Sequence, residues 1–177
     1  MMSEDQYLNK SLFIKIKQLS TGFIEVPGKI SINIYAQGCS KRCPGCHNPD
    51  CQDFNSGEKL FLTDIDIISK DYDMANWICW LGGDAVYQPE ALKAFNKEFK
   101  LRGYGVALYT GKLFEEIQDL VENVDLVVDG EWTGKTIRDQ GTNQSIRVKN
   151  NINQWLILNT WENLDFWYNE RLILNAV

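Results

Sequence analysis

Residues 30–48 read ISINIYAQGCSKRCPGCHN, an alternating apolar run followed at once by a cysteine-rich loop. Isoleucines alternate with polar residues over 30–35, which predicts a strand with one buried face. Cys39, Cys43 and Cys46 follow in the spacing C-x-x-x-C-x-x-C. We therefore expect the three thiols at the carboxyl end of a strand, where α/β folds place their chemistry.

Three thiolates can hold three corners of a [4Fe–4S] cluster, which normally takes four cysteines, so one iron would be left open to another ligand. The alternative is a zinc knuckle, in which the same cysteines and either His47 or Cys51 close a tetrahedral site. Zinc ribbons usually pair two C-x-x-C hairpins, and this chain has no second pair. The cysteine pattern therefore favours an iron–sulfur cluster over zinc.

The composition is that of one globular domain, residues 1–177, with 44% hydrophobic and 24% charged residues. The net charge of −6 and the lack of a basic tract argue against nucleic acid as a partner and give no reason to expect a membrane. Four of the five cysteines fall within 39–51, which fits metal binding in a reducing compartment. The acidic start is not a secretion signal and no run reaches membrane-spanning length, so we expect a cytoplasmic protein.

The rest of the chain alternates strand and helix patterns. Strands are expected over 12–17 and 23–26 as a hairpin, then over 77–81, 104–109, 124–129, 145–149 and 155–158. Helices are expected over 64–73 with a capping box of Thr63 and Asp66, from Pro89 to Gly103, and over 112–122 with Leu113, Ile117 and Leu120 inward. Residues 52–59 and 130–143 read as loops, and 161–177 as a helix or an irregular cap.

This alternation requires parallel pairing with right-handed crossovers. There are too few strand–helix units for a closed eightfold barrel. The predicted fold class is therefore α/β, an open partial (β/α) barrel with a parallel sheet.

The predicted strands end in residues suited to a ligand. Gly82-Gly83-Asp84 would let a ligand approach the backbone closely, although a plain strand-to-helix turn also needs glycine. Thr110-Gly111 follows the next strand, and Thr-Gly before a helix is also ordinary capping. Asp129 ends the following predicted strand. Asn143, Gln144 and Arg147 come further on, and each could equally belong to a hydrogen-bonded loop.

The cysteine motif and these strand ends resemble the radical S-adenosylmethionine (SAM) enzymes. Cys43-Pro44-Gly45-Cys46-His47-Asn48 is similar to the motif of activating enzymes of anaerobic ribonucleotide reductase, as are Tyr109-Thr110-Gly111 and Asp129-Gly130. The resemblance extends from about Phe13 to Arg147. Asp84 stands where the superfamily has Glu, and Glu131-Trp132 stand where the activators usually have Pro and Phe.

The resemblance implies a fold, cofactors and an activity. Cys39, Cys43 and Cys46 would bind the [4Fe–4S] cluster, and Gly82, Gly83, Asp84, Thr110, Gly111, Asp129, Asn143 and Arg147 would contact SAM. A donor such as reduced flavodoxin would supply an electron, SAM would be cleaved, and the resulting radical would take a hydrogen atom from a backbone glycine of the reductase large subunit. His47 is expected to pack beside the cluster, and Cys79 to be a buried core residue.

The resemblance leaves two neighbouring activities open. The chain could activate a formate-lyase, or it could act on a purine-like small molecule. The non-enzymatic alternative is the zinc-binding module.

Overall fold

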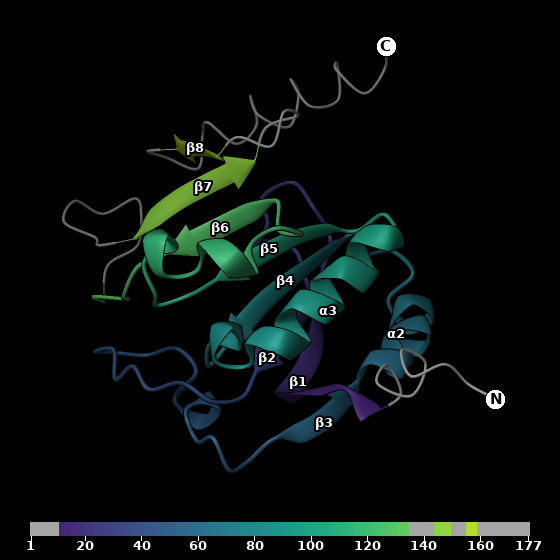
Figure 1. Cartoon of the computed structure of the whole chain (residues 1–177), viewed down its shortest axis with the longest axis horizontal. Helices are drawn as coiled ribbons and strands as arrows, with labels where there is room; N and C mark the ends of the chain where they lie inside the picture. Colours follow the sequence, from purple (N-terminus) through teal and green to yellow (C-terminus); the bar gives the residue numbers. More distant parts are fainter. Residues whose placement is uncertain (1–10, 135–143, 150–154, 159–177) are drawn as a thin grey trace.

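The computed structural model describes residues 11–134, 144–149 and 155–158, which form a single mixed sheet with helices on one face (Figure 1). The strands are β1 (Phe13–Gly22), β2 (Ser31–Ala36), β3 (Glu58–Phe61), β4 (Trp77–Gly82), β5 (Gly105–Tyr109), β6 (Leu126–Asp129), β7 (Ser145–Lys149) and β8 (Trp155–Leu158). The helices are α2 (Ile65–Asp71) and α3 (Pro89–Leu101), and the 3₁₀ turns are η1 (Pro49–Cys51), η2 (Leu62–Asp64), η3 (Ala85–Tyr87), η4 (Phe114–Glu116) and η5 (Gln118–Leu120).

The sheet order is β3-β1-β2-β4-β5-β6-β7-β8. Its centre is parallel: β2 pairs with β4, β4 with β5, and β5 with β6. The strands on the two flanks pair antiparallel with their neighbours: β1 and β3 lie beyond β2, and β7 and β8 lie beyond β6. The predicted α/β class is confirmed. Because β2, β4, β5 and β6 run the same way, the loops that follow them meet at one rim.

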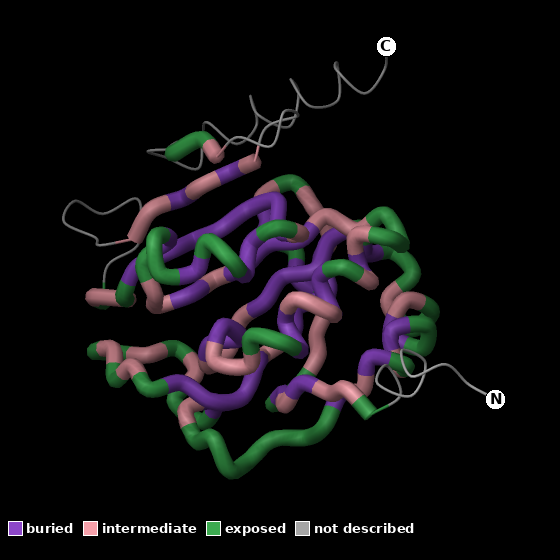
Figure 2. The backbone as a smooth tube through the Cα atoms, viewed as in Figure 1, coloured by how far each residue is buried: buried purple, intermediate pink, exposed green. Residues whose placement is uncertain are grey.

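The larger core lies between the sheet and α3. Leu92, Phe95 and Phe99 are fully buried, as their helical spacing predicts, and both phenylalanine rings pack edge-on against Trp80 of β4. The indole of Trp80 donates a 2.7 Å hydrogen bond to Asn96, so its one polar atom is satisfied inside the core. The parallel strands β2, β4, β5 and β6 are buried along most of their length, whereas the outer strands and much of the cysteine loop are more exposed (Figure 2).

A Schellman motif ends α3. Gly103 adopts φ +83°, its N–H donates to Lys100 O, and Tyr104 N–H donates to Phe99 O. The Tyr104 and Phe99 rings then pack edge-on at 5.8 Å, the hydrophobic contact that accompanies this motif. Gly103 therefore turns the chain directly into β5, as the sequence predicts.

Three local predictions were wrong. Residues 112–122 form the short turns η4 and η5 in place of a helix, and Leu113 is 54% exposed while Ile117 and Leu120 are buried. Residues 23–26 form bends, because β1 is one long strand that pairs with β2 itself. The capping box is made by Asp64, whose carboxylate accepts from Phe61 N–H, and Asp66 pairs with Arg102.

Two further differences are smaller. The expected loop over 52–59 is shorter, because β3 begins at Glu58 and pairs with β1. The helix expected over 64–73 is present as α2. The expectations for Asn143 and 161–177 lie outside the described residues.

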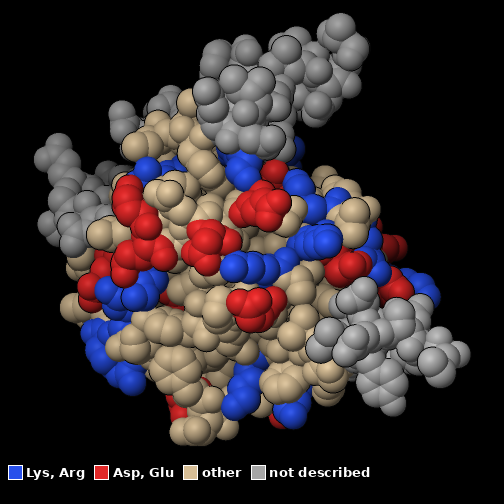
Figure 3. Space-filling model, in the orientation of Figure 1, with Lys and Arg blue, Asp and Glu red and all other residues tan. Residues whose placement is uncertain are grey.

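Basic and acidic side chains alternate on the face seen in Figure 3. Lys93 pairs with Asp119, and Arg102 with both Asp66 and Glu98. Within the described ranges, neither helix is long and apolar enough to cross a membrane.

Candidate functional site

The cysteine loop leaves β2 through a set of fixed backbone contacts. Gln37 N–H donates to Lys15 O, and the Gln37 side-chain amide donates to Asp50 O at 3.1 Å and to Asp53 O at 2.7 Å. Gln88, at the start of α3, donates to Gln37 O from the other side. The two glutamines therefore tie both ends of the loop to β1 and α3.

Gly83 lies where three backbone segments converge. Its N–H donates to Ala36 O, and a Cβ at this position would lie 2.5 Å from Cys51 O and 2.7 Å from Gly38 O. Gly82 adopts φ +94°, and a Cβ there would be 2.8 Å from Ala36 O. The two glycines are thus required by the packing of β4 against the cysteine loop, whatever ligand they also face.

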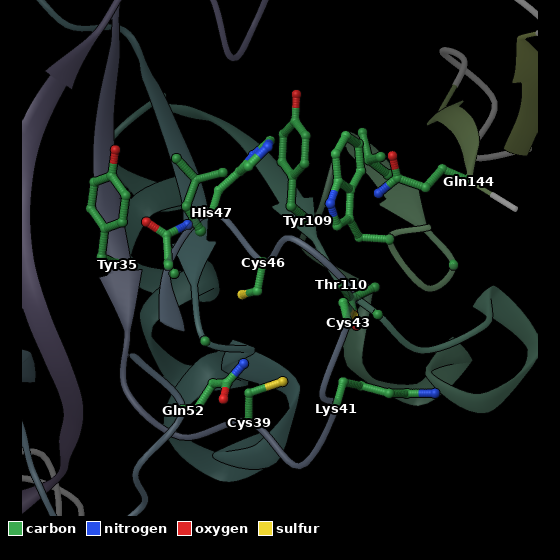
Figure 4. Close-up of a pocket in the computed structure, with 18 of the residues that line it drawn as sticks. Tyr35, Cys39, Lys41, Cys43, Cys46, His47, Gln52, Tyr109, Thr110 and Gln144 are labelled. Carbon is green, nitrogen blue, oxygen red and sulfur yellow. The ribbon is translucent and has the colours of Figure 1, made fainter. Parts of the chain in front are cut away.

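The three predicted cysteines line one cavity of about 470 Å³. Figure 4 shows Cys39, Cys43 and Cys46 coming from the same loop, with Lys41 and Gln52 beside them and Tyr35 and Tyr109 projecting elsewhere in the pocket. Cys39 is buried, whereas Cys43 and Cys46 are half-buried. This cavity has the size of a typical cofactor site.

Burial raises the pKa of Cys39 and of Cys43, so both thiols are protonated at neutral pH when no metal is bound. A metal centre binds thiolates, so its insertion must release these protons. The other two cysteines lie elsewhere. Cys51 is 3% exposed and Cys79 is fully buried in β4, where burial raises its pKa well above the usual range.

The sheet supplies one wall of the cavity. Tyr35 of β2 pairs in register with Leu81 of β4, and Tyr109 of β5 with Val128 of β6, and all four side chains line the cavity. Tyr109 also donates a 2.6 Å hydrogen bond to Glu25 O, which fastens the segment after β1 to this face. Of these wall residues the sequence analysis singled out Tyr109 alone, although the strand periodicity also puts Tyr35 on the face opposite Ile32 and Ile34.

Thr110 and Gly111 line the cavity, as predicted, and Asp84 supports them from behind. The Asp84 carboxylate is 1% exposed and accepts from the Thr110 hydroxyl at 2.8 Å and from Gly111 N–H at 3.0 Å. Burial raises the pKa of Asp84 to about 6. Asp84 is not among the described residues that line the cavity. Through its hydrogen bonds to Thr110 and Gly111, its side chain joins the ends of β4 and β5.

Asp129 and Arg147 are also described, and neither lines the cavity. They pair with each other: Arg147 Nε donates to Asp129 at 2.9 Å, and the guanidinium lies 4.6 Å from the centre of the Phe114 ring. Asp129 also accepts from Phe114 N–H at 3.0 Å. This group fastens β6, β7 and η4 together.

The donor set at the cavity consists of thiols, which suits an iron–sulfur cluster. Within the described part of the chain, no three His, Cys, Asp or Glu side chains converge closely enough to hold one metal ion. Zinc draws its sulfur ligands to about 2.3 Å, whereas a cubane spreads its thiolates over separate irons. Cys39, Cys43 and Cys46 line the cavity and Cys51 and Cys79 do not, so the cavity offers three of the four thiolates that a [4Fe–4S] cluster normally takes.

Comparison with known proteins agrees with this geometry. Residues 26–157 match a protein family described as a 4Fe-4S single cluster domain. The chain is 30% identical over 115 residues to the pyruvate formate-lyase-activating enzyme of Clostridium pasteurianum, covering 62% of this chain and 48% of that protein. It is 33% identical over 116 residues to a Methanocaldococcus jannaschii protein with the provisional name glycyl-radical enzyme activating enzyme, covering 64% and 46%.

The chain thus spans about half the length of the curated relatives it matches. Among solved structures, QueE from Escherichia coli superposes with a TM-score of 0.54 at 14% identity, over 63% of this chain and 57% of that one. At this identity the likeness concerns the fold alone.

Proposed function

The chain belongs to the 4Fe-4S single cluster domain family, within the radical SAM superfamily and with a [4Fe–4S] cluster and SAM as cofactors, and on this premise we propose that it activates an anaerobic ribonucleotide reductase. The observation that carries the proposal is the gathering of Cys39, Cys43 and Cys46 at one cavity at the carboxyl ends of parallel strands. Its substrate would be one backbone glycine of the reductase large subunit.

In this proposal each part of the cavity has a role. The three thiolates hold the cluster, and Gly82, Gly83, Thr110 and Gly111 bring backbone and a small hydroxyl to the position of SAM. When bound, the cluster supplies one electron and SAM supplies the radical that removes a hydrogen atom. The protein itself orients the two cofactors and excludes water.

The hydrogen bonds around Thr110 restrict how it can meet SAM. Its hydroxyl donates its one proton to Asp84 and accepts from Lys112 N–H at 3.1 Å. Any contact of this oxygen with SAM must therefore use the remaining lone pair, so Thr110 would face a donor such as an ammonium or ribose hydroxyl group.

A protein substrate suits the exposure of the rim. Cys43 and Cys46 are only half-buried, and His47 beside them is exposed. A reactive carbon radical cannot be left facing water. The reductase would therefore supply the missing cover, and a reduced flavodoxin or a similar protein would supply the electron.

A second candidate is activation of a formate-lyase. It is favoured by the similarity to the C. pasteurianum enzyme, whose name gives pyruvate formate-lyase as its target. The two candidates share cofactors and chemistry and differ only in the protein that carries the glycine.

The test uses anoxically reconstituted protein with reductant, SAM and one of the two target enzymes. A glycyl radical signal in electron paramagnetic resonance is expected with the reductase large subunit, and its glycine-to-alanine variant and the Cys46→Ala chain should both give none. A signal with formate-lyase alone would establish the second candidate. Fast SAM cleavage driven by a small metabolite, with no radical on either protein, would overturn both.

A further inference from the structure

The segment that follows β6 crosses the rim and contacts the cysteine loop that follows β2. Lys41 Nζ lies 3.6 Å from Glu131 Oε2, and the Trp132 indole donates to Gly45 O at 3.3 Å. The Trp132 and His47 rings are 4.7 Å apart. Three different kinds of contact therefore join the ends of the first and last parallel strands.

This contact also reaches a thiol. A hydrogen bond from the Trp132 backbone lowers the pKa of Cys43 and opposes the larger effect of burial. Trp132, His47, Cys43 and Cys46 all line the same cavity. The segment thus touches the loop at a charged residue, at its backbone and at one predicted ligand.

We propose that Glu131 and Trp132 form a latch on Lys41, Gly45 and His47 that holds Cys43 and Cys46 in place for the cluster and shields it from water. This inference rests on the proposed cluster site. Trp132 is a positioning residue here: it acts on the ligands through the loop that carries them. Hydrogen bonding to cluster sulfurs and solvent exposure are two of the factors that set the reduction potential of such a cluster.

The energetic reasoning favours the ring over the ion pair. Lys41 and Glu131 are 31% and 46% exposed, so their attraction is largely screened by water. The indole instead packs on the His47 ring and donates to Gly45 O, so an aromatic contact and a backbone hydrogen bond act together. Loss of the ring should therefore open the loop more than loss of the charge.

The first experiment uses the metal-free protein. Thiol labelling of Cys43 and Cys46 should be about fivefold faster in Trp132→Ala, the factor that corresponds to one aromatic contact. Trp132→Phe should restore most of the protection. Glu131→Lys should speed labelling, and combining it with Lys41→Glu should return the rate toward that of the wild type.

The second experiment uses the reconstituted protein. Three thiolates make the bound cluster anionic, and reduction adds negative charge, so admitting water favours the reduced state. Trp132→Ala should therefore raise the midpoint potential and hasten loss of iron to a chelator, whereas Trp132→Phe should stay close to wild type. Trp155→Phe is the matched control, because Trp155 packs on Phe114, a residue outside the cavity lining.

Unchanged labelling and an unchanged potential in folded Trp132→Ala would overturn the latch. A wild-type protein that takes up no iron and sulfide would instead contradict the proposed cluster site, while the metal-free labelling would still decide whether the latch exists.

Discussion

The Thr110 hydroxyl at the end of β5 donates a 2.8 Å hydrogen bond to the buried carboxylate of Asp84 at the end of β4. This bond joins the tips of two parallel strands directly behind the cavity. It leaves Thr110 and Gly111 facing the cavity and holds Asp84 out of it. Asp84 therefore supports the cavity from behind.

Replacing Thr110 with Val tests this relationship. The change keeps the shape but removes the donor, so a buried carboxylate and Lys112 N–H each lose a partner. We expect a loss of about 1–3 kcal/mol in the free energy of unfolding, measured by urea denaturation. Thr110→Ser keeps the hydroxyl and should lose much less; equal losses in the two variants would show that the bond does not stabilise the fold.

The raised pKa of Asp84 predicts how the free energy of unfolding depends on pH. Burial raises its pKa from 3.8 to about 6, so the folded state holds this proton more tightly than the unfolded chain. The contribution of this proton to the free energy of unfolding is fully present below about pH 4 and is lost as pH rises through about 6. The total loss is about 3 kcal/mol. Asp84→Asn should flatten this part of the curve. Identical curves for the two proteins would show that Asp84 titrates normally.

Gly83→Ala should damage the fold and the cysteine loop together. Its Cβ would lie 2.5 Å from Cys51 O and 2.7 Å from Gly38 O, and backbone atoms on both sides cannot move away independently. We expect a loss of about 3 kcal/mol or more, together with reduced iron uptake.

Gly111→Ala is the control for this glycine, because the nearest atom to its Cβ would be the flexible Lys41 side chain at 3.2 Å. Iron content and unfolding are measured on the same preparations. A stable Gly83→Ala protein with full iron content would show that the strand end is more tolerant than its packing indicates.

The cysteines should divide into two groups. Single changes of Cys39, Cys43 or Cys46 to Ala should abolish the iron–sulfur absorbance, because each removes one of the three proposed ligands at the cavity. Cys51→Ala and Cys79→Ala should keep it, since both side chains are buried away from the cavity. A complete cluster in Cys43→Ala would rule out the assignment.

Arg147→Ala should lower stability and leave the affinity for SAM in the folded protein unchanged. The change strands the Asp129 carboxylate, which is 3% exposed, and removes the cation from the Phe114 ring. Breaking such a pair costs about 3–5 kcal/mol, to be measured by denaturation beside a SAM binding isotherm. Lys112→Ala removes an exposed ion pair with Glu116 and a contact 5.8 Å from the centre of the Tyr87 ring, and it should cost far less. Weaker SAM binding at intact stability would return Arg147 to the cofactor site.

Local sequence patterns were enough to predict the parallel strands and the buried face of the main helix. The alternation in 30–35 and the apolar runs at 77–81 and 104–109 gave the parallel strands, and the spacing of Leu92, Phe95 and Phe99 gave the buried face of α3. Because parallel strands end on one rim, the sequence also predicted that three cysteines, two glycines and Thr110 would meet. That inference needed only strand direction, which the crossovers fix.

Tertiary structure alone decided which polar side chains face the cavity. The local sequence does not show where Asp84, Asp129 and Arg147 point, because their partners come from distant elements: Asp84 binds Thr110, and Arg147 binds Asp129. Residues 112–122 show helical spacing, yet they fold as two short turns, in which Phe114 contacts Asp129 and the Arg147 guanidinium. Strand pairing and burial determine where these side chains point and which secondary structure residues 112–122 adopt. Neither can be read from a short stretch of sequence.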